Sequence, residues 1–142
     1  FIPYLMPYKK RAKLMLGKYF RHDSDITCDW INGAFFLFTK KILDQLPGKK
    51  LDDRFFMYGE DIDLSLRITQ LGYKNYYLGK ISVTHLKGGS TIYNYKYVGD
   101  FYGAMNLFVK KHYGSKPALY RMFLYTGIGF RKMLAILALP FR

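Results

Sequence analysis

The sequence predicts a single domain of the mixed α/β class, and two observations support this prediction. Strand-like apolar segments alternate along the chain with segments of helical spacing. Of the 142 residues, 50% are hydrophobic and 19% are aromatic, which suffices for one core and excludes a disordered chain. The single cysteine, Cys28, excludes an internal disulfide framework. Because the chain begins with Phe1 and no leader pattern follows, we expect a piece of a longer protein.

The first elements follow a basic, irregular lead-in, which we place at residues 1–25 because prolines interrupt it. Residues 26–31 alternate well enough for a strand. The continuous apolar run 34–38 is typical of a strand that is covered on both faces. Between them, the Asn32–Gly33 pair predicts a tight turn or a kink, since glycine accepts positive φ angles.

Two helical segments are expected next. Residues 40–46 predict a short helix that ends at Pro47. Residues 62–69 are ambiguous, because apolar and polar side chains alternate strictly and by pattern alone predict a strand. An acid at the start and Gly72 after the end are instead typical of a short helix.

The second half of the chain contains two more strand candidates and two helical segments. Residues 73–78 and 81–86 are rich in aromatic and β-branched side chains. Residues 97–112 show helical spacing, with basic side chains in the last turn. Residues 118–141 are apolar but interrupted by basic residues, and no uncharged run approaches the ~20 residues that cross a bilayer. This segment is predicted either to pack on the domain or to lie in a membrane interface.

Charge is unevenly distributed along the chain, whose formal net charge is +13. Residues 1–63 contain 11 basic and nine acidic side chains, whereas residues 64–142 contain 12 basic side chains and one acid. This distribution predicts an anionic partner, which can be a nucleoside diphosphate, a lipid headgroup or a nucleic acid.

The candidate catalytic residues are an acidic triplet, Glu60, Asp61 and Asp63, which follows four large apolar side chains at 55–58. Crowded carboxylates beside an apolar wall are expected to have raised pKa values, which suits a general base. The alternative is structural: Asp61 or Asp63 caps a helix and Glu60 favours its positive end. For an isolated triplet this alternative is the more common one.

Four further sequence features are candidates for binding or catalytic sites. His85 at the end of a strand candidate suits either a divalent metal or a structural role, and the loop with Lys87 and Ser90 could close on a phosphate. Trp30 is either a core residue or a platform for a sugar ring. Residues 23–25 have Asp-x-Asp spacing, but no buried strand precedes them, so an ordinary turn is expected.

Taken together, these segments resemble the C-terminal half of a family 2 glycosyltransferase, especially the bacterial rhamnosyltransferase-like members. The resemblance covers roughly residues 26–114, and its most specific block is Phe-Phe-Met-Tyr-Gly-Glu-Asp-Ile-Asp-Leu at 55–64. The other matching segments are Asp-Trp-Ile-Asn-Gly-Ala at 29–34, Asp-Asp-Arg at 52–54, Gly72-Tyr73, His85 with Gly88-Gly89-Ser90, and faintly 106–114.

The resemblance implies part of a GT-A fold, a Rossmann-like α/β domain with a mixed sheet and flanking helices, followed by a basic helical segment at 115–142. It implies inverting transfer of a sugar from a nucleoside diphosphate to a hydroxyl of a saccharide or lipid-linked saccharide, in cell-surface polysaccharide synthesis. The donor-binding half should precede residue 1, so we expect this fragment to be inactive alone. The absence of Gln-x-x-Arg-Trp favours transfer of a single sugar or a few.

The matching positions also imply roles for individual residues. Asp61 resembles the catalytic base at the start of a helix, which overrules the strand prediction for 62–69. The remaining roles are acceptor contacts at Trp30, Gly33 and Glu60, a diphosphate loop at Lys87 and Ser90, and a ligand of Mg²⁺ or Mn²⁺ at His85.

The alternative function is a non-catalytic basic module that binds anionic lipid or nucleic acid through basic and tyrosine side chains. It leaves unexplained why nine of ten acids precede residue 64. We therefore favour a cytoplasmic transferase, peripheral to the inner face of the cell membrane, whose basic C-terminal segment contacts the membrane and which has no nucleic-acid partner.

Overall fold

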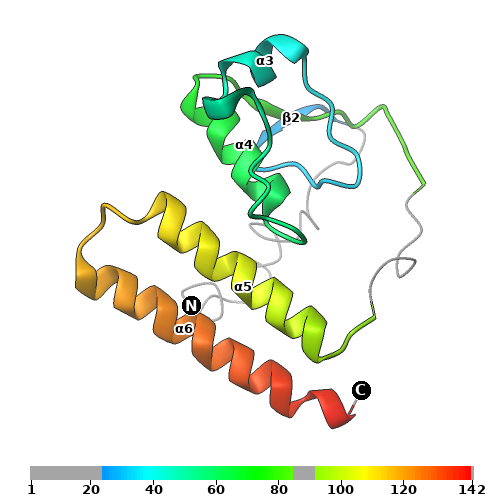
Figure 1. Cartoon of the computed structure of the whole chain (residues 1–142). Helices are drawn as coiled ribbons and strands as arrows, with labels where there is room; N and C mark the ends of the chain where they lie inside the picture. The colour runs from blue at the N-terminus through cyan, green and yellow to red at the C-terminus, as the bar shows by residue number, and fades with distance from the viewer. Residues whose placement is uncertain (1–23, 85–91, 142) are drawn as a thin grey trace.

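The computed structural model describes residues 24–84 and 92–141, and in this part it is a mixed α/β structure, as predicted. Figure 1 shows two adjoining parts: the strands with α3 and α4, and the long helices α5 and α6 lying side by side and antiparallel. The elements in chain order are β1 (Ile26–Cys28), α3 (Lys40–Gln45), η1 (Pro47–Lys49), α4 (Glu60–Gln70), β2 (Asn75–Tyr77), α5 (Tyr95–His112), α6 (Ala118–Leu137) and η2 (Leu139–Phe141).

The sheet is a pair of antiparallel strands, β1 and β2, in which Ile26 lies opposite Tyr77. Buried Asn75 fastens this pair to the neighbouring helix, because its side-chain amide donates to the Asp29 carbonyl at 3.0 Å and to the Ser65 carbonyl at 3.2 Å. The strands predicted at 26–31 and 73–78 are therefore present but shorter than expected.

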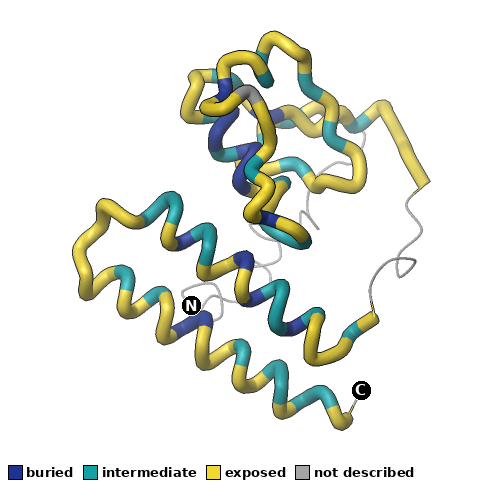
Figure 2. Tube along the Cα trace, viewed as in Figure 1, coloured by how far each residue is buried: buried dark blue, intermediate teal, exposed yellow. Residues whose placement is uncertain are grey.

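In the part of the chain that the structure describes, most buried apolar side chains belong to one of two clusters. The α3–α4 cluster consists of Leu46, Leu64 and Ile68. The α5–α6 cluster consists of Val98, Tyr102, Val109 and Ile128. Figure 2 shows the buried positions along α4 and along α5 where α6 packs, while much of α6 stays exposed. The C-terminal segment thus packs on the domain, one of its two predicted arrangements.

The strand predicted at 34–38 is wrong. Phe36 and Phe38 pack against the α3–α4 cluster, but Phe35 and Leu37 between them are 47% and 74% exposed. Only one face of this segment is covered, and no strand within the described ranges pairs with it. The apolar run therefore forms a loop that begins in a turn, rather than a central strand.

The strand predicted at 81–86 is also not observed in its described part, residues 81–84. Ile81 and Val83 are about half exposed there, so they have no buried face to stabilise a sheet position. Within the described residues the predicted mixed sheet is thus replaced by one antiparallel pair.

Residues 60–70 form helix α4, so the strand suggested by their alternation is wrong and the helix implied by the motif is correct. Leu64 and Ile68 lie four positions apart and bury on one side of the helix. The polar side chains of Asp63, Ser65 and Arg67 are buried as well. The alternation of apolar and polar residues in the sequence therefore does not mark which side of the helix is buried. Each of these polar side chains has hydrogen-bond partners, as buried polar groups require.

The other helices agree with the sequence. Asn94 caps α5 by accepting the Tyr97 N–H at 2.9 Å, and basic residues fill its last turn. Helix α3 ends where Pro47 begins η1. Within the described residues, no helix combines the length and apolar character needed to cross a membrane.

Candidate functional site

The acidic triplet begins α4, where the chain makes a sharp turn. Tyr58 and Gly59 both adopt positive φ angles, 68° and 83°. Gly59 is the N-cap residue, and a Cβ at this position would lie 3.3 Å from the Phe55 ring. Because the N-cap residue is a glycine, neither Asp61 nor Asp63 occupies the capping position that was predicted for one of them. All three acids nevertheless lie in the first turn, where the helix dipole favours negative charge.

Asp61 is held against the loop that contains Gly33. The Gly33 N–H donates to Asp61 Oδ2 at 3.0 Å, and the Ile62 N–H donates to Oδ1 at 2.8 Å. A Cβ at Gly33 would lie 3.3 Å from Asp61 Cβ and 3.6 Å from Glu60 Oε1. The backbone at Gly33 therefore lies close to the side chains of both Glu60 and Asp61.

The turn at Gly33 does not use a positive φ angle, contrary to the sequence prediction. Asn32 shapes it instead, because its side chain accepts the Ala34 N–H at 2.9 Å. Ile31 anchors the loop to α4 by donating its N–H to Ser65 Oγ at 3.1 Å. Trp30 belongs to neither apolar cluster and is 44% exposed, so it does not serve as a core residue.

The structure thus brings together three of the predicted site residues, Gly33, Glu60 and Asp61, with Trp30 on the same loop. The other predicted residues, His85, Lys87 and Ser90, lie outside the described residues. Of the Asp-x-Asp segment at 23–25, Asp23 also lies outside the described residues, and Asp25 accepts the Gly79 N–H at 3.0 Å.

A second group of charged residues was missed by the sequence analysis. Asp63 is buried, and its Oδ1 lies 2.6 Å from both Lys111 Nζ and His112 Nε2 of α5. Its Oδ2 lies 3.4 Å from Arg67 Nη1. The acidic triplet is therefore divided, because Glu60 and Asp61 lie beside the Gly33 loop whereas Asp63 contacts α5.

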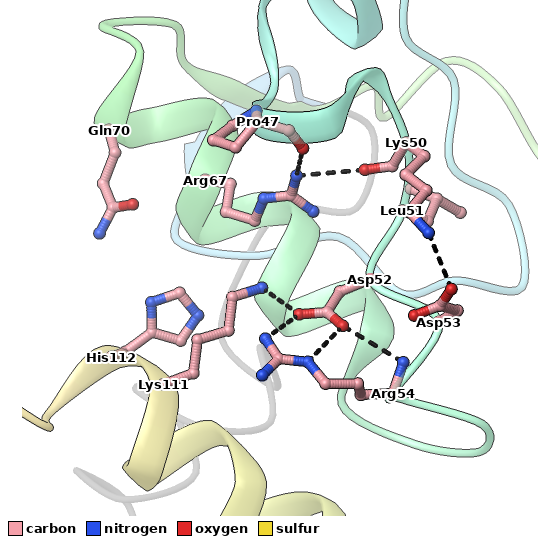
Figure 3. A pocket seen from close by; sticks show the side chains of 10 residues that line it. All are labelled: Pro47, Lys50, Leu51, Asp52, Asp53, Arg54, Arg67, Gln70, Lys111 and His112. Atoms are coloured by element: carbon pink, nitrogen blue, oxygen red, sulfur yellow. Dashed lines mark hydrogen bonds and ion pairs between the residues drawn. The ribbon is translucent and has the colours of Figure 1, made fainter.

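Asp52 extends this ionic cluster. It binds Arg54 at 2.6 and 2.8 Å and Lys111 at 2.7 Å. The hydrogen bonds from Arg54, with a further contribution from Lys111, hold the pKa of Asp52 well below its usual value. These side chains line an open pocket of about 470 Å³ between the η1 segment and the ends of α4 and α5. Figure 3 shows how they lie in it.

Two local signals pointed to the ionic cluster. Asp63 and Arg67 have the i, i+4 spacing of a helical ion pair, and His112 falls on the apolar spacing of residues 97–112. A polar residue on a buried face requires a partner. What the sequence could not supply was the identity of that partner, since Asp63 and His112 are 49 positions apart.

Comparisons with known proteins find two relatives that match part of this chain. Over 62 residues, 44% of this chain, the sequence is 36% identical to two Mycobacterium tuberculosis proteins, from strains CDC 1551 / Oshkosh and ATCC 25618 / H37Rv. Both are described as N-acetylglucosaminyl-diphospho-decaprenol L-rhamnosyltransferase, and the match covers 20% of their length. No family model and no solved structure matches. The similarity supports a glycosyltransferase-like relationship for part of the chain.

Proposed function

We propose that this chain is the acceptor-side part of an inverting glycosyltransferase of the GT-A fold. The proposal rests mainly on the Gly33–Asp61 contact, because it joins two motif segments 28 positions apart at the start of α4. The similarity to L-rhamnosyltransferases supports the same class of enzyme. The matched region covers about a fifth of those relatives, so the activity is proposed for the whole protein to which these residues belong.

In this proposal Asp61 is the catalytic base. An ionised carboxylate offers about four lone-pair positions, and the Gly33 and Ile62 N–H groups occupy two of them. The carboxylate is thereby oriented and still able to accept a proton. It takes the proton of the acceptor hydroxyl while the hydroxyl oxygen bonds to the anomeric carbon of the donor sugar. The bond to the nucleoside diphosphate breaks at the same time, and the diphosphate leaves with the bonding electrons.

The acceptor is assigned to the surface around Glu60 and Trp30. Glu60 is exposed beside Gly33, where it can bind an acceptor hydroxyl, and the half-exposed Trp30 ring offers a flat apolar face to a sugar. The acceptor named for the relatives is linked to a prenol through a diphosphate. We therefore propose a saccharide or lipid-linked saccharide acceptor, and a nucleoside diphosphate sugar as donor.

A divalent metal, Mg²⁺ or Mn²⁺, is proposed on the resemblance alone, with His85 as ligand and Lys87 and Ser90 near the diphosphate. No three His, Cys, Asp or Glu side chains gather into an ion site in the part of the chain that the structure describes. We therefore assign no step to the metal. Titration calorimetry tests His85: His85→Ala should weaken Mn²⁺-dependent binding of the nucleoside diphosphate, and an unchanged affinity would remove His85 from the site.

The test of the base is Asp61→Asn in the whole protein, assayed with L-rhamnose donors first because the relatives are named for that sugar. Asparagine keeps an oxygen for the Gly33 N–H but cannot accept the proton. Transfer should fall by about 10²–10⁴-fold, while calorimetric donor affinity stays close to that of the wild type. Asp53→Asn is the control, since Asp53 is exposed and contacts Lys50. Wild-type turnover by Asp61→Asn would refute the assignment.

A further inference from the structure

Helix α6 has two apolar faces, of which only one is covered by α5. Its inner face contributes Ile128 to the α5–α6 cluster, with Leu124 and Ala135 packed nearby. The opposite side, here called the outer face, recurs at helical spacing with large exposed side chains. Its members are Leu119 (73% exposed), Met122 (59%), Phe130 (49%), Met133 (48%) and Leu137 (60%).

This apolar surface extends over the length of the helix. At its N-terminal end, Pro117, Leu119 and Met122 line an open apolar groove of about 700 Å³. Beyond its C-terminal end, Phe141 of η2 is 88% exposed. A helix with apolar side chains on both faces is normally covered on both, and a continuous exposed patch of this kind marks an interaction site.

The charge of α6 indicates what covers its outer face. The helix contains Arg121, Arg131 and Lys132, Lys116 lies just before it, and no acid follows Asp100. A second copy docked through this face would bring two basic surfaces together, which is unfavourable. Anionic lipid headgroups would meet the same surface with opposite charge, while the acyl chains receive the apolar side chains.

We propose that the outer face of α6 docks on a membrane surface that contains anionic lipids, with the helix lying in the plane of the interface. Helix α5 lies between α6 and α4 (Figure 1), so the outer face points away from the Gly33–Asp61 site. The inference goes beyond the proposed sugar transfer. Vesicles without any saccharide suffice to test it, so it can fail or hold independently of the enzymatic assignment.

The experiment is cosedimentation of the 142-residue chain with vesicles of phosphatidylcholine, either pure or with about a quarter phosphatidylglycerol. The chain should sediment with the anionic vesicles, more weakly as salt screens the charges. Leu119→Glu and Leu37→Glu form a matched pair, because the two leucines are 73% and 74% exposed and the net charge changes equally. Leu119→Glu should weaken partitioning roughly tenfold or more, whereas Leu37→Glu should bind like the wild type.

Three outcomes would overturn the proposal. The first is no sedimentation of the wild-type chain with anionic vesicles. The second is an equal loss of binding in both leucine variants, provided that circular dichroism shows both to be folded. The third is a concentration-dependent dimer in analytical ultracentrifugation that Leu119→Glu dissociates, because the outer face would then be an interface between two copies.

Discussion

Asp63 of α4 and His112 of α5 are joined by a contact of 2.6 Å between Oδ1 and Nε2, and the Asp63 carboxylate is buried. Two positions earlier on the same helix, Asp61 faces the Gly33 loop. Helix α4 therefore presents the candidate base on one side and its attachment to α5 on the other.

Asp63→Asn is expected to destabilise the protein by about 3 kcal/mol, because it leaves buried basic groups without their anionic partner. Chemical denaturation followed by circular dichroism measures the loss. The matched control is Asp53→Asn, which removes an exposed carboxylate whose side chain is 76% accessible and should change stability little. Similar losses in the two variants would contradict the buried anchor.

Gly33→Ala tests the close approach at the candidate site. The added Cβ would lie 3.3 Å from Asp61 Cβ, so the loop must shift and lengthen the hydrogen bond to the carboxylate. We expect a loss of about 1 kcal/mol in stability and a lower rate of sugar transfer. In the control Gly103→Ala on α5, nothing lies within 4 Å of the new Cβ, and the helix should become slightly more stable. Wild-type stability and activity of Gly33→Ala would contradict the contact.

Asn75→Ala tests how the sheet is attached to α4. The variant loses hydrogen bonds to the Asp29 and Ser65 carbonyls, which should cost about 2 kcal/mol. The same substitution at the exposed Asn106 of α5 should not lower the urea midpoint and should raise it slightly, because alanine has the higher helix propensity. If both variants unfold at the wild-type midpoint, Asn75 does not hold these elements together.

The lowered pKa of Asp52 predicts how the stability of the protein depends on pH. Its pKa is lowered in the folded state, chiefly by Arg54, so its ionised form stabilises the fold above the unfolded-state pKa of about 3.9. That contribution is lost as the pH falls below about 4 toward the folded-state pKa. Asp52→Asn should therefore be less stable than the wild type near neutral pH, and the difference should shrink in acid. A difference that stays constant from about pH 7 to about pH 3 would contradict this prediction.

The sequence by itself determined the helices whose signals are local. Periodicity and the basic last turn specify α5, and the stop at Pro47 specifies the end of α3, because each signal acts within a few residues of its target. The motif resemblance placed Gly33 and the Glu60–Asp61 pair in one site, and the structure shows them in contact. The roles proposed for these residues stay predictions.

Only the tertiary structure decided where the buried polar groups point and which apolar segments pair. The alternation of apolar and polar residues at 62–69 predicts a strand. In the structure these residues are helical, because Asp63 and Ser65 are buried and bind partners in α5, β2 and the Ile31 loop. The apolar run at 34–38 predicts a central strand, but the structure covers only one of its two faces. Both outcomes depend on partners far away in the chain, and pairing between distant residues is set by packing rather than by local pattern.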